Sequence, residues 1–140
     1  MKDFTHPKFP TIHIKLLKNE ESSEQLNTLL VDASLKADTV VNFVPENTTT
    51  DNKYLYGIFD EATLVGVIDL IEDYPAKEVA YIHQFFLQDE LSTTTLPETL
   101  YSALEKTAQE TGIAAIEINA DIADLPLWGT LSFVNNKKDI

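Results

Sequence analysis

A chain of 140 residues, of which 44% are hydrophobic, is long enough for a single domain with its own core. Its net charge is −13, and its basic residues are ten lysines and no arginine; this argues against nucleic-acid binding, which needs a basic face, and leaves no arginine for bidentate phosphate contacts. The sequence has no apolar run that could span a membrane, no apolar segment typical of a signal peptide and no cysteine, so we expect a cytoplasmic protein without disulfides.

The first third of the chain predicts a strand, a helix and a polar turn region. Residues 1–10 are expected to form a loose tail. Apolar and polar residues alternate over residues 11–17, which predicts a strand. Asn19 is the predicted amino-terminal cap of a helix. The apolar stripe of this helix consists of Leu26, Leu29, Leu30 and Ala33. The polar stretch over residues 42–52 is turn-rich.

Three consecutive strands are predicted next. Residues 54–59 and 63–71 are rich in β-branched and aromatic residues and predict a hairpin. After a turn at residues 73–76, residues 79–87 are apolar on both faces, as expected of a central strand.

The last third predicts a helix, a strand and a second helix. The apolar stripe of the first helix consists of Leu96, Leu100, Leu104 and Ala108. This helix ends at Gly112, and residues 114–119 form a strand. Residues 123–131 are expected to form a short helix. The predicted order is therefore β-α-β-β-β-α-β-α, which implies one α/β domain over residues 1–140 with a mixed sheet.

Three sequence patterns occur in this order at characteristic spacing. Residues 66–75, GVIDLIEDYP, follow the pattern G-x-x-D-L-x-x-x-Y-P, and the apolar strand over residues 79–87 comes next. Residues 127–133, LWGTLSF, are similar to F-W/Y-x-x-L-G-F. Together these patterns resemble the GNAT family of N-acetyltransferases. The resemblance implies a mostly antiparallel sheet flanked by helices, and transfer of an acetyl group from acetyl-CoA to a primary amine. The alternative is a catalytically inactive GNAT-like module kept for binding or dimerisation.

The resemblance also assigns cofactor-binding positions. Main-chain contacts to the pantetheine and acyl group are expected from Phe86, Leu87 and Gln88. The pyrophosphate loop of the family, Q/R-x-x-G-x-G/A, corresponds to Ser92, Thr93, Thr94, Thr95, Leu96 and Pro97. Two further positions are Asp121, where the family has a pantetheine-binding asparagine, and Trp128, where many members have a tyrosine that serves as general acid.

The segment that matches the pyrophosphate loop departs from the family pattern. It contains neither glycine nor arginine, and Pro97 has no N–H group to offer a phosphate. Thr95 and Glu98 fit a capping box, in which protein side chains would occupy the helix amides. We therefore expect acetyl-CoA to bind weakly.

The candidate catalytic residues are His83, Glu117 and Asp69, and Glu72 and Asp73 lie close to Asp69 in the sequence. His83 is a candidate general base for the amine; the alternative is a histidine hydrogen-bonded within the sheet. The carboxylates would bind or activate a substrate ammonium group; the alternatives are a solvated turn and, for Glu117, an outward-facing position. The acidity of the chain suits a cationic substrate, and it suits solubility equally well. No metal site is predicted, because His6 and His13 lack ligating neighbours at metal spacing.

The carboxyl-terminal segment is short for the family. Only seven residues follow Phe133, so one short strand is the most that they can form. We expect the strand over residues 114–119 to have an uncovered edge. Such an edge favours a homodimer, in which this edge or the helix with Trp128 contacts its symmetry mate.

Overall fold

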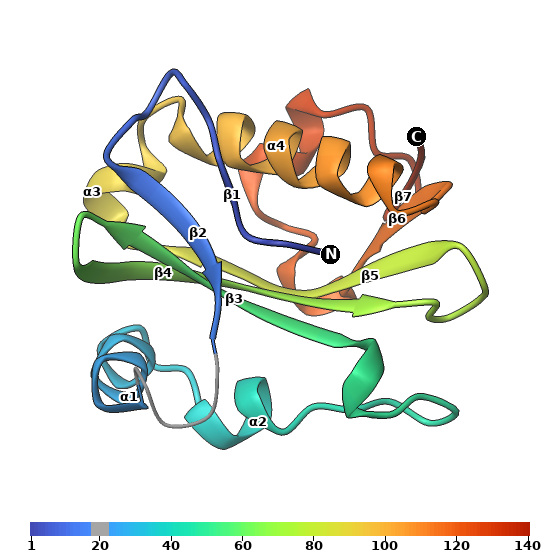
Figure 1. The fold of residues 1–140 in the computed structure, drawn as a ribbon, viewed down its shortest axis with the longest axis horizontal. Coiled ribbons are helices and arrows are strands. Elements are labelled where there is room, and N and C mark those ends of the chain that lie inside the picture. The colour runs from blue at the N-terminus through green and yellow to red at the C-terminus, as the bar shows by residue number, and fades with distance from the viewer. Residues whose placement is uncertain (18–22) are drawn as a thin grey trace.

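The chain forms a seven-stranded mixed sheet with helices on both faces, in a computed structural model that describes residues 1–17 and 23–140 (Figure 1). The strands lie in the sheet in the same order as in the chain, from β1 to β7. All neighbouring strands are antiparallel except β5 and β6, which are parallel. The predicted mixed, mostly antiparallel sheet is therefore confirmed.

The strands are β1 (Phe4–Thr5), β2 (Ile12–Leu16), β3 (Lys53–Asp60), β4 (Thr63–Glu72), β5 (Val79–Leu87), β6 (Ala115–Ile118) and β7 (Lys137–Asp139). The α-helices are α1 (Ser23–Asp32), α2 (Ala37–Val41), α3 (Asp89–Ser92) and α4 (Leu96–Glu110). Short 3-10 helices cover Thr50–Asn52, Ala120–Ile122 and Pro126–Thr130. Within the described part of the chain, no helix is both long enough and apolar enough to cross a bilayer.

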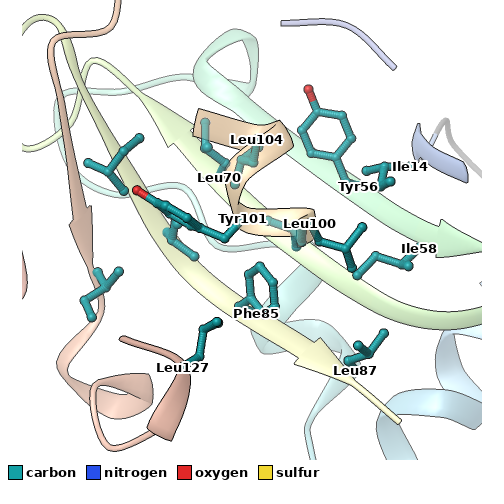
Figure 2. Packing of buried hydrophobic residues seen from close by; sticks show 14 of the residues in the cluster. Ile14, Tyr56, Ile58, Leu70, Phe85, Leu87, Leu100, Tyr101, Leu104 and Leu127 are labelled. Atoms are coloured by element: carbon teal, nitrogen blue, oxygen red, sulfur yellow. The ribbon is translucent and has the colours of Figure 1, made fainter. Parts of the chain in front are cut away.

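Two hydrophobic clusters hold the helices against the sheet. On one face, Leu100, Tyr101 and Leu104 of α4 are completely or almost completely buried and lie over Leu70 and Phe85 of the sheet (Figure 2). On the other face, Leu26, Leu29 and Leu30 of α1 pack in a cluster with Phe59, Leu64 and Val67. The predicted apolar stripe of α4 and the leucines of the stripe predicted for α1 thus face the sheet, and burial of their side chains stabilises the fold, whereas Ala33 lies after the end of α1.

The strand β5 is paired on both sides over only part of its length. It pairs along its length with β4, but β6 pairs only with its first half, from Val79 to Ile82. The register between β4 and β5 shifts so that Asp69 lies opposite Gln84 and Leu70 opposite Ile82, which leaves one extra residue, His83, in β5. A β-bulge of this kind re-aims a side chain and ends regular pairing.

The amino terminus is not a loose tail, as residues 1–10 were predicted to be. Phe4–Thr5 pairs with β2 as β1. The Asp3 carboxylate accepts a hydrogen bond from the Leu16 amide at 2.8 Å, and the Lys2 carbonyl accepts one from the Tyr56 hydroxyl at 3.0 Å. These contacts depend on partners far away in the chain, and for this reason residues 1–10 carry no periodic pattern of their own.

The edge of β6 is covered, contrary to the prediction for residues 114–119. Lys137–Asp139 forms β7 and pairs with Ala115–Glu117. The seven terminal residues provide the single strand that was expected, and this strand lies where the uncovered edge was predicted. The homodimer stays a prediction, but it loses this support.

Several local predictions also need correction. The expected helix over residues 123–131 is a 3-10 helix over Pro126–Thr130, and α2 and α3 were not expected. The capping box of Thr95 and Glu98 does not form, since the Thr95 side chain makes no capping hydrogen bond. Gly112 follows the last turn of α4 with φ of 92°, as predicted for a residue that ends a helix. Asn19 lies outside the described residues.

Candidate active site

A cleft of about 430 Å³ opens beside the half of β5 that β6 does not cover. Its floor includes His83, Gln84, Phe85 and Phe86 of β5. One wall comes from residues 33–36, between α1 and α2, and from Thr39 and Val40 of α2, and the other comes from residues 119–125, after β6. Because β6 ends at Ile118, backbone groups of β5 in this region can face a ligand instead of another strand.

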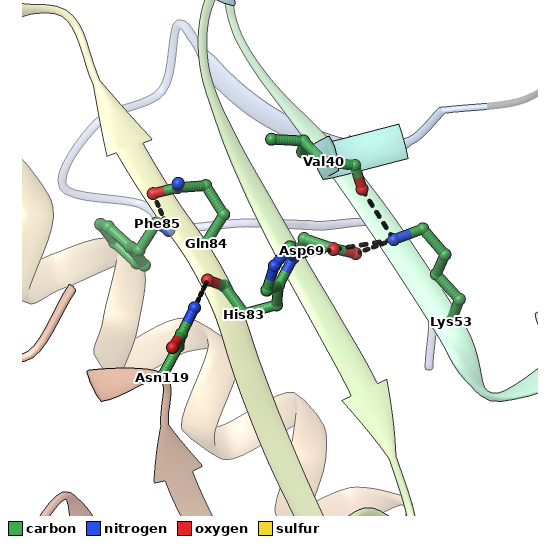
Figure 3. A network of polar contacts seen from close by, with 7 residues as sticks. All are labelled: Val40, Lys53, Asp69, His83, Gln84, Phe85 and Asn119. Atoms are coloured by element: carbon green, nitrogen blue, oxygen red, sulfur yellow. Dashed lines mark hydrogen bonds and ion pairs between the residues drawn. The ribbon is translucent and has the colours of Figure 1, made fainter. Parts of the chain in front are cut away.

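A buried polar network joins three strands beside this cleft (Figure 3). The Asp69 carboxylate of β4 is completely buried. It lies 2.8 Å from Nδ1 of His83 in β5 and 2.7 Å from Nζ of Lys53 in β3. Lys53 also donates to the Val40 carbonyl at 2.9 Å. The Asp69 carboxylate, the two side chains that contact it and the carbonyl that fixes Lys53 thus come from four elements, α2, β3, β4 and β5.

The network defines how the imidazole of His83 is held. A carboxylate accepts hydrogen bonds, so Nδ1 of His83 carries the proton in this contact and Nε2 is left as a basic nitrogen. The Lys53 ammonium compensates the charge of Asp69, so the imidazole does not need to be protonated to stabilise the carboxylate. A neutral imidazole that lines a cleft can accept a proton from a substrate.

An aromatic wall covers the imidazole. The Phe43 ring stacks on His83 with a centroid distance of 3.8 Å and an interplanar angle of 11°. Tyr81 lies next to Phe43 at 6.4 Å, and Tyr74 makes an edge contact with Tyr81 at 5.1 Å. Burial raises the pKa of Tyr81, and Tyr74, Asp121 and Glu117 raise it further. The wall therefore combines aromatic faces with neighbouring carboxylates, an environment that favours a cation.

The bulge also changes the hydrogen bonding of β5. The Phe85 amide donates at 3.0 Å to the side-chain carbonyl of Gln84, not to a neighbouring strand. The Asn119 side chain donates to the His83 carbonyl at 3.1 Å, and the Asn119 amide donates to the Ile82 carbonyl at 2.9 Å. Asn119 thereby closes the end of the β5–β6 ladder at the point where the cleft begins. The Phe85 amide becomes available to a ligand once the side chain of Gln84 rotates away.

The structure brings two of the three candidate catalytic residues together. His83 and Asp69 are hydrogen-bonded, whereas Glu117 lies elsewhere on β6, opposite Tyr81 on one side and Lys137 on the other. Glu72 lies at the end of β4, and its carbonyl accepts a hydrogen bond from Asn52. The Asp73 carboxylate accepts from the Glu78 amide at 2.8 Å and closes the turn, as in the structural alternative for this residue.

The predicted cofactor-binding residues are spread over several environments. Phe86 and Asp121 line the cleft, whereas Leu87 is buried in the core. Gln88 donates its amide to the Val65 carbonyl at 3.0 Å. Trp128 is only 4% exposed, and its Nε1 donates to the Ile122 carbonyl at 2.8 Å. Its ring packs against Phe85, Tyr101 and Phe133, so this side chain is part of the core and does not line the cleft.

The segment that matches the pyrophosphate loop joins α3 to α4. Ser92 is the last residue of α3, Thr93, Thr94 and Thr95 connect the helices, and Leu96 and Pro97 begin α4. Oγ1 of Thr94 accepts a hydrogen bond from the Leu96 amide at 3.1 Å. These residues do not fit a diphosphate, because one of the first amides of α4 is already bonded and the next residue has none.

Sequence reasoning missed Lys53, Phe43 and Asn119. Lys53 lies just before the predicted hairpin, and its approach to Asp69 depends on the observed register, which pairs Leu55 with Asp69 after an irregularity in the pairing of β3 with β4. Phe43 lies in an irregular segment and Asn119 follows a strand end, so neither position follows from periodicity. Within the part of the chain that the structure describes, no group of three or more histidine or acidic side chains could hold a metal ion.

No protein-family model matches the sequence, and no curated protein is significantly similar to it. Several solved structures are similar in fold. A Bacillus subtilis acetyltransferase in complex with CoA is 24% identical, with a TM-score of 0.57 over 85% of this chain and 74% of that chain. A putative ribosomal-protein-serine acetyltransferase from Vibrio cholerae is 16% identical, with a TM-score of 0.67 over 92% and 81% of the two chains. The PaiA N-acetyltransferase from Thermoplasma acidophilum, in complex with coenzyme A, is 15% identical, with a TM-score of 0.62 over 92% and 99%. At these identities the likeness concerns the fold.

Proposed function

We propose that this chain, whose fold is that of the GNAT acetyltransferases, transfers an acetyl group from acetyl-CoA to a primary amine. The solved structures with this fold include two complexes with CoA, which supports a CoA thioester as the donor. The cleft beside β5 is the proposed place of reaction, and His83 is the proposed general base.

One observation carries this proposal: the hydrogen bond of 2.8 Å between Asp69 and His83 at the edge of the cleft. A buried carboxylate that orients an imidazole, with the other ring nitrogen left as the basic one, is an arrangement used for proton transfer. The purely structural alternative for His83 explains the hydrogen bond, but it does not explain why the side chain lines a cleft.

The residues around the cleft would act on the amine and on the thioester in different ways. The amine nitrogen attacks the thioester carbonyl carbon, the carbon–sulfur bond breaks, and the amine proton passes to Nε2 of His83 and then to the leaving thiolate. The Phe85 amide would polarise the thioester carbonyl once Gln84 releases it. Asp121, which lines the cleft and lies near Tyr81, would attract the cationic form of the acceptor toward the base.

The test is an acetyl-transfer assay with a panel of polyamines and aminoacyl amines, on wild type and on two histidine variants. His83→Ala should lower kcat/KM by about 100-fold or more, since loss of a general base typically costs two to four orders of magnitude. His13→Ala is the matched control, because His13 lies on β2, away from the cleft. Equal rates for the two variants would refute the role of His83.

A second candidate function is an inactive GNAT-like module that binds a ligand or partner. The closed connection between α3 and α4 favours it, since a transferase that anchors CoA through its diphosphate needs a place for that group. Binding of a donor without turnover of any amine in the panel would support this alternative over catalysis.

A further inference from the structure

We infer that the donor site recognises an acylated pantetheine thiol and makes no use of the nucleotide diphosphate of CoA. This inference rests on the proposed acyl-transfer function and specifies the chemical class of its donor. A thioester of free pantetheine, or of the phosphopantetheine of a carrier protein, should then be as good a donor as acetyl-CoA.

The amino-terminal end of α4 offers little to a diphosphate. A helix end binds phosphates through free backbone amides. Here Oγ1 of Thr94 accepts from the Leu96 amide, and Pro97 has no amide hydrogen. Leu96 is also only 2% exposed and belongs to the core under α4, so the first turn of the helix packs against protein.

The connection from α3 to α4 is closed by its own hydrogen bonds. The hydroxyls of Ser92, Thr93 and Thr94 donate to carbonyls of α3 at 2.9, 3.4 and 2.6 Å. A backbone nest for an anion needs a residue in the left-handed region, and none between Glu78 and Gly112 has a positive φ. Three hydroxyls of the connection are therefore already bonded to the protein, and the connection lacks the backbone shape that would surround a phosphate.

The charges around this connection oppose an anion as well. Asp89 and Glu90 are exposed on α3, and Glu98 lies in the first turn of α4. No lysine or arginine occurs between Lys77 and Lys106. Three carboxylates without a nearby cation in the sequence would repel the two negative charges of a diphosphate.

The cleft itself suits the other half of the donor. Pantetheine is uncharged and carries two amide groups, which can pair with the backbone of an exposed strand edge. The part of β5 beyond Ile82 is such an edge, and the cleft contains apolar side chains of Phe85, Phe86 and Ile122. The thiol end would then lie near the Phe85 amide and His83, where the acyl group reacts.

Titration calorimetry with CoA, pantetheine and ADP tests this inference without turnover, because ADP carries the diphosphate without the pantetheine arm. CoA and pantetheine should bind with Kd values within about threefold of each other, and ADP should not bind. The inference is overturned if CoA binds more than about 30-fold tighter than pantetheine, if ADP binds, or if pantetheine does not bind.

Turnover assays then distinguish CoA from a carrier protein as the source of the thioester, and they test the inference separately from the proposed function. Acetyl-CoA, acetyl-pantetheine and an acetylated phosphopantetheinyl carrier protein are compared with one amine acceptor. Similar kcat/KM for acetyl-CoA and acetyl-pantetheine supports the inference, and a carrier-protein donor that is about tenfold better identifies the carrier as the source. If acetyl-CoA is turned over and acetyl-pantetheine is not, the inference is overturned and the proposed function stands. Pantetheine binding without turnover of any donor refutes the proposed function and leaves the binding inference intact.

Discussion

A carboxylate buried as completely as Asp69 depends on the cations that touch it. Lys53 compensates its charge at 2.7 Å, on the side opposite to the contact with His83 that the carboxylate makes at 2.8 Å. In a Lys53→Met variant Asp69 loses this cation and one of the two contacts that hold it in place. The value of kcat/KM should therefore fall by about tenfold or more, because the carboxylate no longer orients the imidazole for proton transfer.

The measurement must separate a role in catalysis from a role in folding. Removing one partner of a buried ion pair typically costs about 3–5 kcal/mol, so folding is checked first by urea unfolding. Lys15→Met is the matched control, since Lys15 is exposed on β2 and its ammonium lies over the Phe59 ring. Equal kcat/KM for wild type and folded Lys53→Met would contradict the proposed role of Lys53.

Two buried tyrosines differ in whether their hydroxyls are satisfied. The Tyr56 hydroxyl donates to the Lys2 carbonyl, whereas the Tyr101 hydroxyl has no hydrogen-bond partner among the described residues, although the Glu105 carboxylate is near it. An unsatisfied buried hydroxyl costs about 1 kcal/mol or more. Tyr101→Phe should therefore raise the free energy of unfolding by about 1 kcal/mol, and the control Tyr56→Phe should lower it by a similar amount in urea titrations at neutral pH.

The same two tyrosines make stability depend on alkaline pH. Burial raises the pKa of both groups above the ordinary value of 10, and Glu105 adds to the effect at Tyr101. The unfolded chain therefore loses these protons at lower pH than the folded chain, so stability is complete below about pH 10 and falls as the pH rises beyond it. Tyr101→Phe should weaken this alkaline loss; an unchanged dependence of unfolding on pH would contradict the argument.

At the scale of secondary-structure elements, the connection between α3 and α4 should be convertible into a phosphate site. The variant Ser92→Arg/Thr95→Gly/Pro97→Gly restores an arginine, the two glycines and the missing amide of the family pattern. It should tighten CoA binding by about tenfold, or ~1.4 kcal/mol, and leave pantetheine binding unchanged. Ser102→Arg adds the same charge at an exposed position of α4 and serves as the control. A rebuilt connection that binds CoA no better than wild type would show that the pocket is lost for another reason.

Elements with a strong internal pattern could be predicted from the sequence, and elements that depend on a distant partner could not. The stripe of α4 and the apolar run of β5 are local signals, and both elements have nearly the predicted bounds. The strands β1 and β7 have two and three residues and exist only through pairing with β2 and β6. The site divides in the same way: His83 and Asp69 could be named as candidates, but their contact and the role of Lys53 follow from strand register and a bulge, which no local pattern encodes.

At the scale of the whole molecule, a net charge of −13 works against self-association. The predicted homodimer should therefore strengthen as salt screens this repulsion. With β6 covered, Leu125 and Val134, 40% and 70% exposed, are apolar side chains available for such a contact. Sedimentation equilibrium at micromolar protein, in about 0.02 M and about 0.5 M NaCl, should show more dimer at the higher salt. A 15.7 kDa species at both concentrations would contradict the homodimer.

The order of the strands in the sheet also bears on how the chain is made. Because the sheet order is β1 to β7, the same as the chain order, each strand pairs with the one synthesised just before it. A chain that emerges from the ribosome amino terminus first can add its strands one at a time to an edge that already exists. β6 is separated from β5 by α3 and α4, so the parallel pair can form only after α4 has emerged. The cleft beside β5, which needs residues up to Leu125, is therefore completed only after α4 and β6 have emerged, and β7 alone is added to the sheet later.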